Sequence, residues 1–138
     1  MRPGRLRAAP ALAVLALLAA CAAPGRPACG PGERPAVSEL LYFGSATPDG
    51  AVSAEAWSVF LAETVTPRFP DGLTAWPASG QWRGADGALV HEASWVLNLV
   101  HPGDPEAEAG VRAVVEAYKA RFQQEAVLRV RSGACVSL

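Results

Sequence analysis

The chain lacks a second long hydrophobic run and lacks any cluster of basic residues. Hydrophobic residues make up 51% of its 138 positions, but the N-terminal segment inflates this fraction. No later stretch approaches the roughly 18 consecutive apolar residues that a membrane-spanning helix needs. The net charge is −1 and the arginines are scattered, which argues against a nucleic-acid partner. The sequence therefore predicts one small domain without a further membrane segment.

The usual motifs of catalytic and cofactor-binding sites are also missing. The sequence contains no G-x-S-x-G nucleophile elbow, no P-loop and no glycine-rich dinucleotide fingerprint. Its two histidines, His91 and His101, stand ten residues apart, outside the spacings of common metal sites. We therefore predict no metal and no cofactor, and the sequence identifies no catalytic residue.

The N-terminus has the features of an export signal. Three arginines within the first seven residues precede an apolar segment over 8–18, which is too short to span a bilayer. Leu18-Ala19-Ala20-Cys21 follows, and it resembles the lipobox of bacterial lipoproteins, in which the cysteine becomes the acylated first residue. The alternative is an ordinary secretory signal cut at the Ala-x-Ala pattern of residues 20–22. We expect a signal peptide over 1–20 and a membrane anchor, for example palmitate, on Cys21. In a Gram-negative cell this anchor would lie in the outer membrane.

The segment after the signal reads as a tether, and two cysteines remain beyond Cys21. Residues 22–36 are rich in proline, glycine and alanine, a composition that cannot repay the entropy of folding. We therefore expect a flexible tether over 21–37 and a single domain over 38–138. In an oxidising compartment Cys29 and Cys135 would form a disulfide, although free thiols or a reactive nucleophile are alternatives.

Four stretches of the domain have the composition of β-strands. The runs 40–44 and 89–100 carry apolar residues on both faces, which is typical of central strands. Pro77 interrupts the segment 73–83, and because proline cannot donate a ladder hydrogen bond, we expect this segment at a sheet edge. The last strand is predicted over 127–131.

Two helices complete the predicted fold. Ser53 is a suitable N-cap for a helix that ends near Val65, and Asp104-Pro105 begins a second helix that continues to about residue 122. The order is β-α-β-β-α-β, which predicts an α+β, ferredoxin-like two-layer sandwich with an antiparallel four-stranded sheet in spatial order 4-1-3-2. In that topology the last strand ends near the start of the first, where the two cysteines lie.

The sheet face without helices is the main candidate for a binding site. Alternation along the strands would place Asn98, Arg129 and Arg131 on this face, together with Val96, Val100 and Val127. An apolar patch with a few cationic groups could be a dimer interface or a cleft for an anionic or amphipathic ligand. Alternatively, the long segment 75–88, with Trp76 and Trp82, could cover it.

Two functional hypotheses follow from these features. The first is a non-catalytic envelope lipoprotein that binds a partner or a small ligand. The second is a small cofactor-independent enzyme that uses the open sheet face, alone or as a dimer. A homodimer through the sheet face is compatible with both hypotheses. The enzyme hypothesis requires six polar side chains to converge in a deep pocket. These are Gln81, Arg83, His91, Asn98, His101 and Arg129.

Several stretches together resemble a bacterial family known as domain of unknown function 3574, which includes predicted secreted proteins and lipoproteins. The matching stretches begin at Leu41-Tyr42-Phe43-Gly44 and continue with 67–74, 80–83, 118–125 and 127–128. Ala126 departs from the serine expected at that position, so the resemblance implies no role for a hydroxyl there. It brings no activity and no cofactor, and it implies only a single exported domain.

Overall fold

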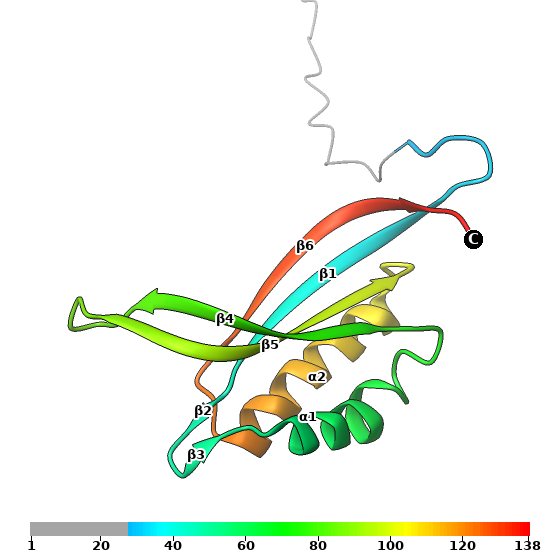
Figure 1. The fold of residues 1–138 in the computed structure, drawn as a ribbon. Helices are drawn as coiled ribbons and strands as arrows, with labels where there is room; N and C mark the ends of the chain where they lie inside the picture. Colours follow the sequence, from blue (N-terminus) through cyan, green and yellow to red (C-terminus); the bar gives the residue numbers. More distant parts are fainter. Residues whose placement is uncertain (1–27) are drawn as a thin grey trace, which may run out of the picture.

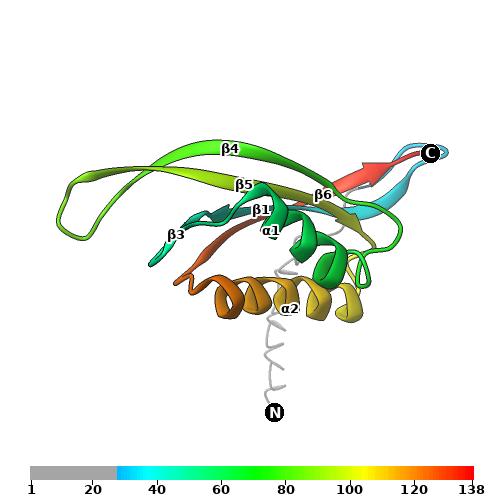
Figure 2. The same cartoon turned by 60° about the horizontal axis from the view of Figure 1, so that its bottom comes forward.

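A computed structural model describes residues 28–138 of the chain (Figure 1). The predicted signal peptide, Cys21 and the first part of the predicted tether lie outside the described residues. The described chain is a mixed α+β domain with one four-stranded antiparallel sheet. Two helices lie side by side on one face of this sheet and leave the other face without a helix (Figure 2). None of the helices in the described residues is long and apolar enough to cross a membrane.

The sheet has the spatial order β4-β5-β1-β6. As expected, the strands that are apolar on both faces lie in the middle, and the strand that contains Pro77 lies at an edge. The last strand is longer than predicted. The strands are β1 (Arg34–Gly44), β4 (Thr74–Arg83), β5 (Leu89–His101) and β6 (Val127–Val136).

The start of β1 differs from the expected end of the tether. Residues 34–37 pair with β6 from Val136 to Gly133, so they belong to the sheet although their composition resembles that of the tether. A disulfide between Cys29 and Cys135 joins the segment before β1 to the end of β6, as predicted. These two links explain why a proline-containing segment is ordered here. Its backbone is paired with β6, and the residues before it are joined to β6 by the disulfide.

Side-chain caps begin both helices. The Ser53 side chain accepts a hydrogen bond from the Ala56 N–H at 3.1 Å, and Asp104 accepts one from the Ala107 N–H at 2.8 Å. The first predicted helix is divided into an α-helical and a π-helical part, and a small hairpin not expected from the sequence precedes it. These elements are β2 (Ala46–Thr47), β3 (Gly50–Ala51), α1 (Ala54–Phe60), the π-helix η1 (Leu61–Val65) and α2 (Pro105–Phe122).

Aromatic rings fill the core between the sheet and the helices. The Phe43 ring of β1 lies 5.2 Å from Trp57 of α1 and 4.6 Å from Tyr118 of α2, measured between centroids. Trp95 of β5 stacks on Trp57 at 5.6 Å. The Tyr118 hydroxyl donates to the Gly44 carbonyl at 2.8 Å, and burial raises the pKa of this phenol above its ordinary value. These contacts fix β1 and β5 against both helices and thereby define the helix-covered face.

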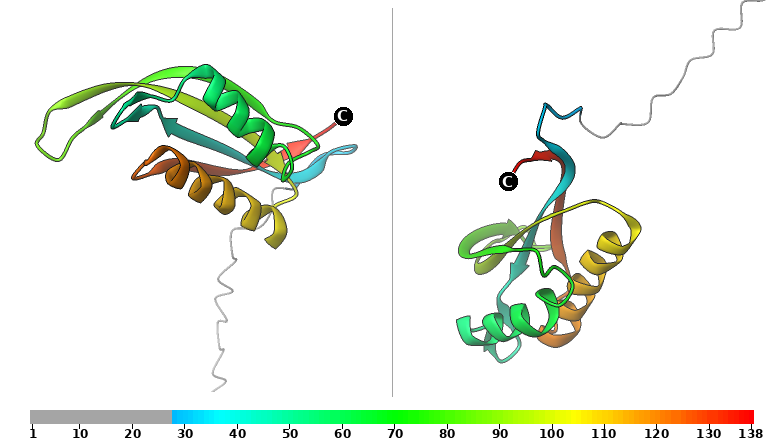
Figure 3. Two further views of the ribbon diagram at one scale, coloured as in Figure 1. Left: turned by 90° about the horizontal axis from the view of Figure 1, so that it is seen from below. Right: turned by 90° about the vertical axis from the view of Figure 1, so that its right-hand side faces the viewer.

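The β4–β5 hairpin extends beyond the rest of the sheet (Figure 3). β1 pairs with β5 only from Ser94 to His101, so residues 89–93 of β5 pair with β4 alone. The outer half of this hairpin is therefore a two-stranded arm that projects past α1 and the end of β1.

Candidate functional site

The sheet face opposite the helices carries an uncovered apolar surface, which we call the open face. The register places Leu128, Tyr42, Val96 and Trp76 in one row across the four strands. Leu128 is 63% exposed and Trp82, on the hairpin arm, is 54% exposed. Successive strand residues point to opposite faces of the sheet, so this alternation identifies the apolar members of the open face and its amide. They are Leu40, Tyr42, Trp76, Trp82, Val90, Val96, Asn98, Val100, Leu128 and Val130.

Of the side chains that alternation places on the open face, Glu92, between Val90 and Val96, is acidic, and Arg34 lies at the far end of β1. The open face also carries an amide. This amide, Asn98, accepts a long hydrogen bond from the Ser38 hydroxyl at 3.4 Å. Glu92 lies near the β2–β3 hairpin, where its carboxylate accepts the Ala46 N–H at 2.8 Å. The open face is therefore a mainly apolar surface whose amide and carboxylate both accept hydrogen bonds from neighbouring residues.

The predicted composition of this face is wrong for three of its six residues. Val96, Asn98 and Val100 lie on the open face as expected, but Val127, Arg129 and Arg131 point to the helix-covered side. Val127 packs against the core, and both arginines contact acids beneath the sheet. Leu128 and Val130 point outward in their place, 63% and 46% exposed.

A buried carboxylate explains this orientation of β6. Glu39, in the middle of β1, is fully buried on the helix-covered face. Arg131 stands directly opposite Glu39 in the register and Arg129 is its diagonal neighbour. A buried carboxylate is costly unless it is paired and hydrogen-bonded, so β6 presents its arginines inward and its leucine and valine outward.

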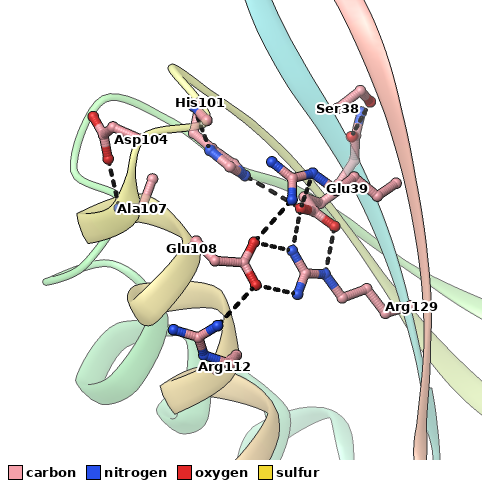
Figure 4. Close-up of polar contacts among 11 residues, drawn as sticks. Ser38, Glu39, His101, Asp104, Ala107, Glu108, Arg112 and Arg129 are labelled. Atoms are coloured by element: carbon pink, nitrogen blue, oxygen red, sulfur yellow. Dashed lines mark hydrogen bonds and ion pairs between the residues drawn. The ribbon is translucent and has the colours of Figure 1, made fainter. Parts of the chain in front are cut away.

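Glu39 belongs to a cluster of charged residues between the sheet and α2, which we call the charge cluster (Figure 4). Arg129 Nε donates to Glu39 Oε2 at 2.7 Å, and the same guanidinium donates to both Glu108 oxygens at 2.9 and 2.7 Å. Arg131 Nη1 donates to Glu108 at 3.2 Å and Arg131 Nε lies 3.6 Å from Glu39. Arg129 is thus held between two carboxylates.

The charge cluster shifts the titration of its members. The hydrogen bond from Arg129 lowers the pKa of Glu108 from 4.5 to about 2, against the opposing effect of burial. The charges of Arg129, Arg131 and Arg112 add to this lowering. The hydrogen bonds to Glu39 and Glu108 raise the pKa of Arg129 further above its ordinary value. Glu108 is therefore ionised at neutral pH beside the charged Arg129.

His101 is buried beside the charge cluster. Its Nδ1 accepts the Gly103 N–H at 3.0 Å, so Nε2 carries an N–H of the ring. Nε2 faces Glu39 Oε1 at 3.5 Å, which is too long for a normal hydrogen bond. His101 therefore packs against the buried carboxylate, and its Nε2 lacks a close partner in the described part of the chain.

The remaining predicted site residues lie on the hairpin arm. Gln81 and His91 line a shallow, open hollow of about 400 Å³. Arg83 Nη1 donates to the Gly87 carbonyl at 2.8 Å and so supports the hairpin turn. The six polar residues of the enzyme hypothesis thus fall in three places. Gln81, Arg83 and His91 lie on the arm, Asn98 on the open face, and His101 and Arg129 in the charge cluster.

The described residues offer no suitable metal ligand set. Cys29, Glu33 and Cys135 are close enough together to be considered, but the disulfide occupies both sulfur atoms. The Glu33 carboxylate accepts the Gly30 N–H at 2.8 Å. This group of residues therefore stabilises the junction of the chain ends and has no thiolate to give to a metal.

Sequence reasoning missed both acids of the charge cluster. Glu39 stands alone in an apolar strand, and a lone acid in such a run is a usable signal that a cation must lie opposite. The i, i+4 spacing of Glu108 and Arg112 indicates a pair on the solvent side of the helix, and that contact exists at 3.4 Å. The closer contacts of Glu108 are with β6, 21 residues and more away in sequence, which no local pattern reveals.

The sequence of the domain matches a known protein family. The sequence profile of DUF3574, described as a protein of unknown function, matches residues 38–138. The chain belongs to the DUF3574 family. This result confirms the resemblance noted from the sequence, and the family description brings no activity. No curated protein matches the chain.

Solved structures share the fold of the DUF3574 domain. A phage SAM lyase in complex with S-methyl-5'-thioadenosine superposes with a TM-score of 0.56 at 15% identity, over 81% of this chain and 95% of that one. CutA from Synechococcus elongatus superposes with a TM-score of 0.53 at 11% identity, over 76% of this chain and 83% of that one. At these identities the similarity concerns the fold alone.

Proposed function

We propose that this DUF3574 protein is a lipid-anchored protein of the bacterial envelope that acts as a non-catalytic binding module through its open face. The uncovered apolar surface carries this proposal, because soluble domains seldom leave a contiguous patch of this kind free. Two tryptophans and a tyrosine lie among its exposed members, and such side chains are enriched in binding surfaces. We also assign the domain to the ferredoxin-like sandwiches, in keeping with its strand order.

The proposed location depends on the N-terminal signal and on the cysteines. Cys21 ends the lipobox-like sequence, and a disulfide between the other two cysteines suits an oxidising compartment. A membrane anchor at Cys21 would hold the domain by its β1–β6 end, close to the disulfide. The hairpin arm and the helices would then face away from the point of attachment.

The enzyme hypothesis gains no support from the arrangement of the polar groups. It requires its six polar side chains to converge, and they are divided among the arm, the open face and the charge cluster. The charge cluster itself is internally paired, with each carboxylate bound by an arginine. The hollow on the arm is shallow and contains only Gln81 and His91 of the six.

Cell fractionation tests the lipid anchor. A Cys21→Ser variant should lose labelled palmitate and leave the membrane fraction, whereas an Ala23→Ser control should behave like the natural protein. A membrane fraction that is unchanged in the Cys21→Ser variant would refute the anchor.

Hydroxyl-radical footprinting in intact envelopes tests the open face as a binding surface. Labelling of Trp76, Trp82 and Leu128 should be reduced several-fold relative to the same protein unfolded in urea. Val59, which is exposed on α1 outside the open face, is the reference. If the open face is labelled as freely as Val59 after this normalisation, then it is uncovered in the cell and the proposal fails.

A further inference from the structure

We propose that the occupant of the open face is a second copy of this chain, so that two domains pack sheet against sheet with their helices outside. This inference rests on the proposed function, because it names the partner of the same surface. Its three arguments are the size of the surface, its mainly apolar composition and the shape of the hairpin arm.

The size of the open face suits a dimer of small domains. Its exposed members include three aromatic residues between 37% and 54% exposed and four aliphatic residues between 36% and 63%. With roughly 150–250 Å² for a whole aromatic side chain, these fractions amount to several hundred Å² of apolar surface. A standard interface buries about 800 Å² per partner, and polar rim residues supply the rest. The exposed apolar surface thus approaches the area that one partner contributes to a standard interface.

The charge distribution favours an apolar occupant. Pairing with Glu39 and Glu108 draws both arginines of β6 to the helix-covered face, so β6 offers the open face no cation for an anionic ligand or for acidic headgroups. A charged partner would lose hydration over the apolar members of this face. A second copy presents the same mainly apolar surface, and the acid of this face, Glu92, already accepts a hydrogen bond from the Ala46 N–H.

The hairpin arm supplies a place for the second copy. Trp82 and Val90 form a further apolar pair of the open face on the arm, beyond Gly80 and Glu92, where β5 pairs with no strand except β4. The arm thus extends the surface past the chain's own body, as the views from two sides show (Figures 2 and 3). In a face-to-face pair with the usual sheet spacing of about 10 Å, each arm would lie over the sheet of the other copy.

Photo-crosslinking in cells tests this pairing with the full chain. Benzoylphenylalanine is introduced at position 128, which is strongly exposed near the start of β6, and at position 130 as an independent second site. Irradiation should give a product of about twice the chain's mass. When a tagged and an untagged chain are expressed together, a third product of intermediate mass should appear.

Controls distinguish failure of the dimer from failure of the binding surface. The same crosslinker at position 59, on α1, should give no dimer. A product with a different protein, or a small mass increase from a phospholipid, would overturn the dimer but leave the open face as a binding surface. Absence of any product from positions 128 and 130, with the chain folded and exported, would overturn both.

A matched pair of substitutions gives the second measurement. Val130→Glu places a carboxylate on the open face and should reduce the dimer product from position 128 by about tenfold or more, because the charge would be buried without a partner. Val59→Glu introduces the same charge at a similarly exposed valine on a helix and should leave the product unchanged. Equal yields from both variants would contradict a face-to-face pair.

Discussion

At the scale of single residues, one buried carboxylate determines how β6 faces the core. Glu39 is fully buried, and its closest cation is Arg129, which also binds Glu108 of α2. The charge cluster therefore joins a central strand, an edge strand and a helix through one guanidinium. A planar fork with several donors can bind two carboxylates at once, which an ammonium cannot do with the same geometry.

Replacing Arg129 tests this role. Arg129→Met should lower the free energy of unfolding by about 3–5 kcal/mol, because Glu39 would remain buried without its partner. Arg131→Met is the control, since Arg131 is more exposed and 3.6 Å from Glu39, and it should cost about 1 kcal/mol or less. The double variant Glu39→Met/Arg129→Met should recover much of the loss. Equal effects of the two single variants in urea unfolding would show that Arg129 has no special role.

The acidity of Glu108 gives a second prediction at this scale. Its pKa of about 2 lies below the ordinary value of 4.5, so the unfolded chain binds a proton at higher pH than the folded one. Its stabilising effect is therefore complete above about pH 4.5 and is lost as the pH falls toward 2. Glu108→Gln should be less stable than the natural protein by about 1 kcal/mol at pH 7.

The measurement is urea unfolding of both proteins at several pH values. The difference between them should shrink between pH 4.5 and pH 2. Glu116→Gln, which removes only an exposed pair with Lys119, is the control and should show a smaller difference at pH 7. A Glu108→Gln difference that stays constant over this range would contradict the assigned pKa.

At the scale of elements, the features that depend on near neighbours could be predicted. The two caps, the proline at the sheet edge and the central strands follow from residues within a few positions of one another. The orientation of β6 could not, because it is decided by Glu39, 90 residues away. Alternation alone allows two orientations of β6, and the wrong orientation assigns every side chain of this strand to the wrong face of the sheet. The short β2–β3 hairpin and the π-helical end of the first helix gave no distinct periodicity.

The start of α2 provides a prediction at the element scale. Asp104 accepts the Ala107 N–H, so Asp104→Ala should lower the free energy of unfolding by about 1 kcal/mol. Asp104→Asn is the control, because an asparagine side chain can accept the same hydrogen bond. The helix start also positions Glu108 one turn later, so the alanine variant should weaken the charge cluster. Thermal or urea unfolding in which Asn and Ala variants are equally destabilised would exclude the cap as the cause.

At the scale of the whole molecule, the candidate site was only partly predictable. The sequence identifies an uncovered sheet face and places Val96, Asn98 and Val100 on it correctly. Its chemical character was wrong, since the expected arginines lie beneath the sheet. Of the alternatives left open by the sequence, this difference disfavours the anionic ligand and favours the dimer interface. Which face receives the charges depends on pairing across the entire fold, so local patterns give the topology of the domain more reliably than the chemistry of its surface.

The disulfide gives the last prediction, because it closes almost the whole domain into one loop. Cys29 and Cys135 are 106 residues apart, and closing a loop of this length restricts the unfolded chain by up to about 4–5 kcal/mol in the chain-entropy model. Reduction should therefore lower the urea midpoint strongly, and Cys29→Ser/Cys135→Ser should unfold at the low midpoint with or without reductant. Reduction should first affect the junction of β1 and β6, because residues 34–36 of β1 pair with β6 and with no other strand. Hydrogen exchange that becomes faster at 34–36 than at 40–44 on reduction would show this order, and an unchanged midpoint on reduction would show that sheet pairing alone holds the chain ends.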